Sequence, residues 1–115
     1  MPVAVDHEST VVTELLSAMP PGSQGVDSVD RMRAWLGQHG DEYVVVLGPN
    51  LAFEECLRVC EDLRSQRPTV SVVMVRPEVD AMLLGSAMKA GARDLVKEGD
   101  DASVADAVTR AHQLF

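Results

Sequence analysis

The stretch that indicates the fold most clearly reads Tyr43-Val44-Val45-Val46-Leu47-Gly48-Pro49. It is a continuous apolar, β-branched run that ends abruptly at a glycine and a proline. Such a run is typical of a strand that is buried on both faces of a parallel sheet. We therefore interpret residues 43–47 as a buried strand whose tip is Leu47-Gly48-Pro49.

Short β-rich runs alternate with amphipathic segments on both sides of this strand. The expected strands are residues 1–6, 23–27, 43–47, 70–75 and 94–96. The expected helices cover residues 11–19, 28–39, 78–90 and about 101 to the terminus, and a further helix runs from an Asn50 cap to Pro68. Gly40 and Gly91 are expected to end the helices that precede them. Five alternations predict an α/β fold, a doubly wound (βα)5 parallel five-stranded sheet with helices on both faces. Its most favoured winding is the flavodoxin-like order 2-1-3-4-5.

Two cysteines lie four residues apart on the helix that follows Asn50. Cys56 and Cys60 share a helical phase with Leu63, so we interpret them as small core residues in the reduced state. No second pair of Cys or His residues stands at the spacing of zinc ligands. The sequence therefore predicts no metal site at these cysteines.

The helix over residues 78–90 is rich in apolar residues. Its apolar residues at helical spacing are Met82, Leu83, Ala87 and Ala90. The small pair Gly85-Ser86 is expected to permit close packing. Since Met82 and Met88 are six positions apart, one of the two is expected to face outward and offer apolar surface to a partner.

Composition excludes several classes of protein. The 115 residues make one domain. Eighteen acidic against ten basic residues give a net charge of −8, which disfavours a nucleic acid partner. The longest apolar runs are about five residues, too short to span a membrane, and the first residues lack a basic signal-peptide region, so a cytoplasmic setting is expected. The chain stops at Phe115, where the last helix should end, as a domain of a longer protein would.

Residues 87–92 read Ala-Met-Lys-Ala-Gly-Ala. In this run and in its whole layout the chain resembles the receiver domains of bacterial two-component response regulators. The resemblance implies a receiver-like fold. It also implies a phosphorylation site, with a carboxylate nucleophile at the tip of the third strand and acids after the first strand that hold Mg²⁺. A hydroxyl after the fourth strand, a lysine after the fifth and an aromatic residue on the fifth complete that site.

The first and third strands keep little of this pattern. The position of the nucleophile falls on Leu47 or Gly48, neither of which can accept a phosphoryl group. Asp6 fits the first acidic position, but His7 stands at the second, where Glu8 is the available substitute. His7 beside these two acids could bind a divalent ion, although a surface loop is the simpler interpretation.

The fourth and fifth strands depart from the pattern as well. The fourth ends in Met74-Val75-Arg76-Pro77 without a hydroxyl, and Ser71 comes too early. Leu95 stands where an aromatic residue is expected, and Lys97 lies near the lysine position, with a solvated surface lysine as the plainer account. We therefore expect no aspartyl phosphorylation, no tight Mg²⁺ site and no cofactor.

Residues 46–49 and 91–96, together with the missing phosphorylation site, resemble the receiver-like domain at the front of TadZ/CpaE pilus-assembly proteins. In that family the domain precedes a MinD/ParA-like ATPase and helps to place the pilus machinery. The resemblance implies that such an ATPase either follows in cis in the full protein or was never attached to this domain. These residues contain no Gly-rich P-loop of their own.

The sequence therefore predicts a non-enzymatic interaction domain that forms a homodimer or docks with other assembly or signalling proteins. Receivers commonly pair through the face of the fourth helix, fifth strand and fifth helix, so the expected contact residues are Met82, Lys89, Arg93, Asp94 and Arg110. One alternative is a phosphoaccepting receiver with displaced acids, which would use Asp6 or Glu8 with Mg²⁺. Another is a flavodoxin-type binder of a small ligand, but no phosphate loop follows the first strand.

Overall fold

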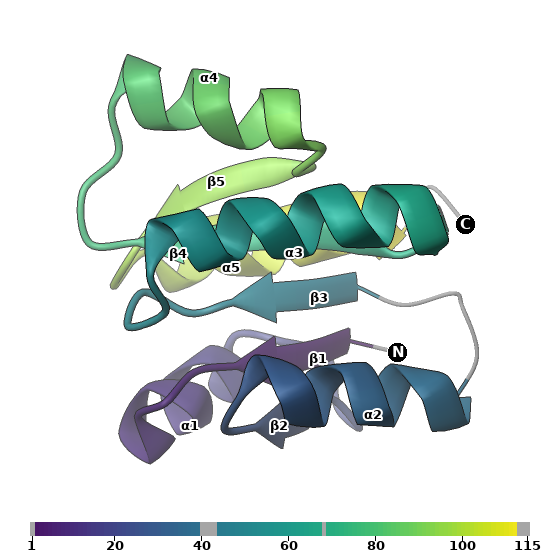
Figure 1. Ribbon diagram of the computed structural model, residues 1–115. Coiled ribbons are helices and arrows are strands. Elements are labelled where there is room, and N and C mark those ends of the chain that lie inside the picture. The colour runs from purple at the N-terminus through teal and green to yellow at the C-terminus, as the bar shows by residue number, and fades with distance from the viewer. Residues whose placement is uncertain (1, 40–43, 68, 113–115) are drawn as a thin grey trace.

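Strands and helices alternate along the part of the chain that the structure, a computed structural model, describes: residues 2–39, 44–67 and 69–112. The strands are β1 (Pro2–Val5), β2 (Gln24–Val26), β3 (Val44–Leu47), β4 (Ser71–Arg76) and β5 (Asp94–Lys97). The helices are α1 (Ser9–Ser17), α2 (Val29–His39), α3 (Phe53–Gln66), α4 (Ala81–Ala90) and α5 (Asp101–His112). The strands pair in parallel in the order β2-β1-β3-β4-β5 (Figure 1). The predicted fold class and strand order are confirmed.

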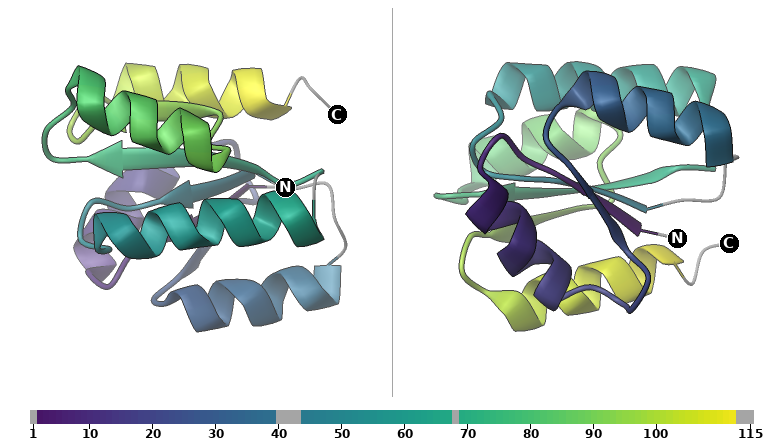
Figure 2. Two further views of the ribbon diagram at one scale, coloured as in Figure 1. Left: turned by 45° about the horizontal axis from the view of Figure 1, so that its top comes forward. Right: turned by 90° about the horizontal axis from the view of Figure 1, so that it is seen from below.

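The helices cover the two faces of the sheet unequally. α2, α3 and α4 pack on one face, and α1 and α5 pack on the other (Figure 2). Successive side chains of a strand point to opposite faces, so Val45 and Leu47 of β3 enter the first core, and Val44 and Val46 enter the second. All four side chains are fully buried. Burial on both faces explains why this strand is a continuous apolar run without polar alternation.

The N-terminus of α3 differs from the prediction. The helix begins at Phe53, and its N-cap residue is Ala52, which makes no side-chain capping bond. Asn50 does not cap the helix, because its side-chain amide instead donates a hydrogen bond to Asp6 at 2.9 Å. The buried and unpaired Cys56 and Cys60 on this helix confirm the predicted core positions.

Both ends of α4 have defined caps. The helix begins at Ala81, three residues later than predicted, because the carboxylate of Asp80 accepts a hydrogen bond from the Leu83 N–H at 2.8 Å. It ends as predicted at Gly91, whose φ of 111° is left-handed. A Cβ at this position would also lie 3.0 Å from Cδ of Arg64. Glycine is therefore required there by conformation and by space.

The exposed side of α4 is more apolar than predicted. Met82 is 84% exposed and Met88 is 42% exposed, whereas Ala87 and Ala90 are buried. At least one of the two methionines was expected to face outward, and both contribute to the surface. The expected close packing at Gly85 is wrong, because an added Cβ would have no atom within 4 Å.

The remaining boundaries shift by a residue or so. β4 and β5 extend to Arg76 and Lys97, which pair in register. β1 and β2 are shorter than predicted, and α5 begins at Asp101 as expected. The predicted strand start at Tyr43 and helix ends at Gly40 and Pro68 lie outside the described residues. No helix in the described ranges is long and apolar enough to cross a membrane.

Candidate functional site

The carboxyl ends of the strands form the edge where open α/β sheets ordinarily bind ligands, above all where the strand order reverses. Here that point lies between β1 and β3, since the chain passes from β1 to β2 on one side and then to β3 on the other. Asp6 directly follows β1, and Gly48 directly follows β3. The Gly48 N–H donates to the Val5 carbonyl at 2.7 Å, which holds the two strand ends side by side.

The Asp6 carboxylate is completely buried and fully engaged with backbone and amide donors. Its Oδ1 accepts hydrogen bonds from the Glu8 N–H at 2.8 Å and from Nδ2 of Asn50 at 2.9 Å. Its Oδ2 accepts the Asn50 N–H at 3.1 Å. We call these three bonds the Asp6 link. A buried carboxylate is costly unless it is hydrogen-bonded, so the link stabilises it and joins the loop after β1 to the turn after β3.

Asp6 also occupies the space in front of Gly48. A Cβ at Gly48 would lie 2.0 Å from Oδ2 and 2.7 Å from Cγ of Asp6, far inside van der Waals contact. A side chain at position 48 therefore needs room that the Asp6 carboxylate fills. The neighbouring Leu47 is fully buried in the core beneath α2 and α3. Neither position expected to carry the nucleophile presents a carboxylate.

The two residues after Asp6 do not gather into a metal centre. The group of Glu8 that reaches Asp6 is its backbone N–H, and the Glu8 residue is exposed. His7 is also exposed, and its Nδ1 lies 3.0 Å from the Asp27 carbonyl oxygen. Within residues 2–39, 44–67 and 69–112, no group of three or more His, Cys, Asp or Glu residues is placed to hold a metal ion.

An arginine stands at the end of β4, where the receiver pattern has a hydroxyl. Arg76 donates from Nη1 to the Leu51 carbonyl at 2.6 Å, and its guanidinium lies 5.5 Å from the centre of the Phe53 ring. These contacts hold the turn after β3 against β4. Ser71 is buried at the opposite end of β4, which confirms that it lies too early to serve the site.

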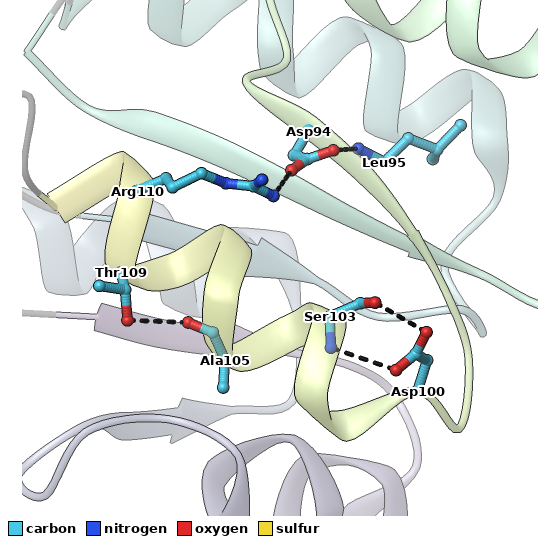
Figure 3. Close-up of polar contacts among 7 residues, drawn as sticks. All are labelled: Asp94, Leu95, Asp100, Ser103, Ala105, Thr109 and Arg110. Carbon is cyan, nitrogen blue, oxygen red and sulfur yellow. Dashed lines mark hydrogen bonds and ion pairs between the residues drawn. The ribbon is translucent and has the colours of Figure 1, made fainter.

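The β5 side of the site carries a leucine and a lysine. Leu95 is buried in the core, and Lys97 is exposed, as the surface interpretation predicts. Beyond it, Asp100 accepts hydrogen bonds from the N–H and the hydroxyl of Ser103 at 3.1 and 2.7 Å (Figure 3). These bonds lower the pKa of Asp100, the hydroxyl contributing most, and they cap α5.

The sequence did not identify Asn50 and Arg76 as residues of this site. Asn50 follows the Gly48-Pro49 turn, which is the local signal that could have suggested a polar turn residue. Arg76 contacts Leu51, 25 positions earlier in the chain, so nothing in its own neighbourhood predicts the contact.

The five predicted contact residues lie on α4, β5, α5 and the turn between α4 and β5. Met82, Lys89, Arg93 and Arg110 are exposed, and Asp94 is half-buried. Asp94 and Arg110 form an ion pair between β5 and α5 (Figure 3). Met82 lies on the first turn of α4 and Lys89 on its last, so the five residues spread along this face and do not form one cluster.

Solved structures with this fold include receiver domains and pilus proteins. The receiver domain of NarL from Mycobacterium tuberculosis is similar with a TM-score of 0.79 at 14% identity, over 97% of this chain and 94% of that one. A CpaE pilus assembly protein from Burkholderia thailandensis gives a TM-score of 0.78 at 17% identity, over 97% of each chain. An atypical orphan response regulator gives a TM-score of 0.78 at 11% identity, over 100% of this chain and 98% of that one. At these identities the likeness shows a shared fold alone.

The family of the protein is assigned by comparing its sequence with those of known families. No curated protein sequence matches the chain significantly. The sequence model of the family described as pilus assembly protein TadZ, N-terminal, matches residues 18–113. This match covers all the helices and strands of the structure after α1 and well over half of the chain. The protein therefore belongs to the family of TadZ N-terminal domains, with a receiver-like fold.

Proposed function

We propose that this chain is a non-enzymatic protein-interaction domain of a TadZ/CpaE-like pilus assembly protein and that it acts without phosphorylation. The observation that carries the proposal is the burial of Asp6 against Gly48. The three bonds of the Asp6 link use both carboxylate oxygens, and position 48 has no room for a side chain. A receiver needs a free nucleophile and an open Mg²⁺ ligand at these two places.

Two further observations support this proposal. The similar orphan response regulator is described as having a phosphorylation-independent regulatory mechanism. The 115 residues contain no P-loop, so the ATPase that the family resemblance implies is not formed by these residues.

The surface that we propose for self-association is the exposed face of α4. Its large exposed apolar side chains are Met82, Leu84 and Met88, with Val79 just before the helix. From Ala81 to Met88 the helix carries no charged residue, although the protein has a net charge of −8. Two copies therefore approach with the least repulsion and bury the most apolar surface if they meet at α4.

Phosphate transfer is tested by intact-mass measurement after incubation with acetyl phosphate and Mg²⁺. We expect an unchanged mass, because the Asp6 carboxylate is buried and hydrogen-bonded and neither Leu47 nor Gly48 carries a nucleophile. A receiver domain with its aspartate intact, treated in parallel, controls for donor activity. A stoichiometric gain of one phosphoryl group that disappears in Asp6→Ala or Glu8→Gln would overturn the proposal in favour of a displaced phosphoacceptor.

Self-association is tested by sedimentation velocity over a range of micromolar concentrations. We expect a reversible dimer that Met82→Asp weakens, because each copy would then bring a carboxylate into the apolar contact. Gln38→Asp is the matched control, since it adds the same charge at an exposed position of α2. A monomer at every concentration, or equal weakening by both variants, would exclude pairing through α4.

A further inference from the structure

A second polar feature lies at the opposite edge of the sheet from Asp6 and Gly48. A hollow of about 330 Å³ opens between the C-terminal halves of α3 and α4, beside the starts of β4 and β5. Its lining includes Cys60, Arg64, Val70, Val72, Met88 and Arg93. We call it the basic hollow, because two arginines line it and none of the described lining residues is acidic.

The Arg64 side chain is held at the C-terminal end of α4. Its Nη1 donates to the Lys89 carbonyl at 3.0 Å, and its Cδ packs against Gly91, where an added Cβ would lie only 3.0 Å away. One role of Arg64 is therefore to stabilise the C-terminal carbonyls of α4. This contact uses one of the five N–H donors of the guanidinium, whose orientation is fixed before any ligand arrives.

Arg93 reaches the same hollow from the turn before β5. Its backbone N–H donates to the Val72 carbonyl at 2.8 Å, which fixes its position on the sheet edge. The adjacent acid, Asp94, forms its ion pair with Arg110 of α5, on the other face of the sheet (Figure 3). The Asp94 carboxylate therefore pairs with Arg110 on the side away from Arg93, and the side chain of Arg93 is exposed.

This distribution of charge is unlike the rest of the protein. The chain has 18 acidic and 10 basic residues, yet two arginines share a hollow without a lining carboxylate. The ion pairs Arg31–Asp27, Arg33–Asp62 and Arg110–Asp94 all lie outside it. An oxyanion bound between two arginines takes charge-assisted hydrogen bonds from both.

We propose that the basic hollow binds a small molecule that carries phosphate or carboxylate groups. Arg64 and Arg93 hold the oxyanion, and Val70, Val72 and Met88 contact an apolar part of the ligand. The volume lies at the lower end of the range for small-ligand sites, which favours a small molecule over a segment of a protein. The proposal does not depend on the proposed function, since anion binding requires neither the Asp6 link nor self-association. Met88 is the one residue that the basic hollow shares with the exposed apolar side chains of α4.

Isothermal titration with sodium pyrophosphate and, separately, with sodium succinate tests the site at constant ionic strength. We expect at least one of the two anions to bind, and the one that does identifies phosphate or carboxylate as the preferred group. Arg93→Gln should raise the dissociation constant of that anion by about tenfold, the typical effect of a lost charge-assisted hydrogen bond. The matched control is Arg58→Gln, which removes an equal charge from an exposed position of α3 and should leave binding unchanged.

A second variant and a stability check complete the test. Arg64→Gln should also weaken binding, but it removes the contact with Lys89, so thermal unfolding must confirm that this variant is folded. If it is not, Arg93→Gln decides alone, because its side chain is exposed. Absence of binding by both anions at millimolar concentration would overturn the proposal. Equal weakening by Arg93→Gln and Arg58→Gln would do the same, since it would indicate general attraction to positive charge.

Discussion

The contact between Asp6 and Gly48 restricts position 48 through space and not through backbone conformation. The described glycines with positive φ are Gly22, Gly91 and Gly99, so the backbone at Gly48 accepts any residue. The obstacle is the Asp6 side chain, whose Oδ2 would lie 2.0 Å and whose Cβ would lie 2.7 Å from an added Cβ. An aspartate at position 48, as in a phosphorylated receiver, would require Asp6 to leave its three donors.

Gly48→Ala should therefore lower the free energy of unfolding by about 1–3 kcal/mol, the usual range for overpacking a buried site. Asp6→Ala should also destabilise the protein, because it leaves the donors of Glu8 and Asn50 without their acceptor. The double variant should lose somewhat less than the sum, since removal of the carboxylate relieves the overlap with Oδ2 and Cγ, while the Cβ of residue 6 stays 2.7 Å from the new methyl group. Urea unfolding followed by circular dichroism measures all three.

Gly85→Ala is the matched control for this cycle. The same methyl group is added in open space on α4, where it should stabilise the protein by about 0.5–1 kcal/mol through helix propensity. Strict additivity of Gly48→Ala and Asp6→Ala, or a neutral effect of Gly48→Ala, would mean that the two residues do not compete for space.

At the level of the elements, α4 shows why a helix can be predicted while its buried side is not. Its sequence from Ala81 to Met88 carries no charged residue, so the spacing of apolar residues does not select one face. The structure buries the small Ala87 and Ala90 against α3 and β5, and it leaves Met82 in solvent. The caps were more predictable, because Gly91 must be a glycine for reasons within its own turn.

The two cysteines of α3 are expected to make the protein less stable at alkaline pH. Burial is the main cause that raises the pKa of Cys56 from 9.0 to about 11 and the pKa of Cys60 from 9.0 to about 12. The unfolded chain releases both thiol protons near pH 9, whereas the folded chain keeps them. The contribution of the thiols is therefore complete below pH 9 and is lost as pH rises through the folded values. The urea concentration at the midpoint of unfolding, measured from pH 7.5 to 10.5, should decrease once the pH exceeds about 9.

The double variant Cys56→Ala, Cys60→Ala separates the thiols from other groups that titrate in this range. It should start from a lower stability because two buried sulfur atoms are lost, but its decline above pH 9 should be shallower. Equal slopes in the parent and the variant would show that the thiols are not the source of the alkaline loss.

For the whole molecule, sequence patterns predicted the topology because each part of that prediction is local. Alternation of strands and helices indicates a parallel sheet, and an unbroken apolar run such as Val44–Leu47 indicates a strand with two covered faces. The Asp6 link could not be predicted in this way, since it joins residues 44 positions apart. Likewise, a net charge of −8 describes the average surface and gives no sign that Arg64 and Arg93 share a hollow.

The position of β1 has a consequence for where the domain is taken to begin. β1 is the first strand in the chain but an inner strand of the sheet, paired with β2 on one side and β3 on the other. The residues that match the family, 18–113, begin after it. A fragment trimmed to those residues would lose Asp6 and separate β2 from the rest of the sheet. The folding unit therefore has to be delimited by strand pairing, and it includes residues upstream of the segment that matches the family.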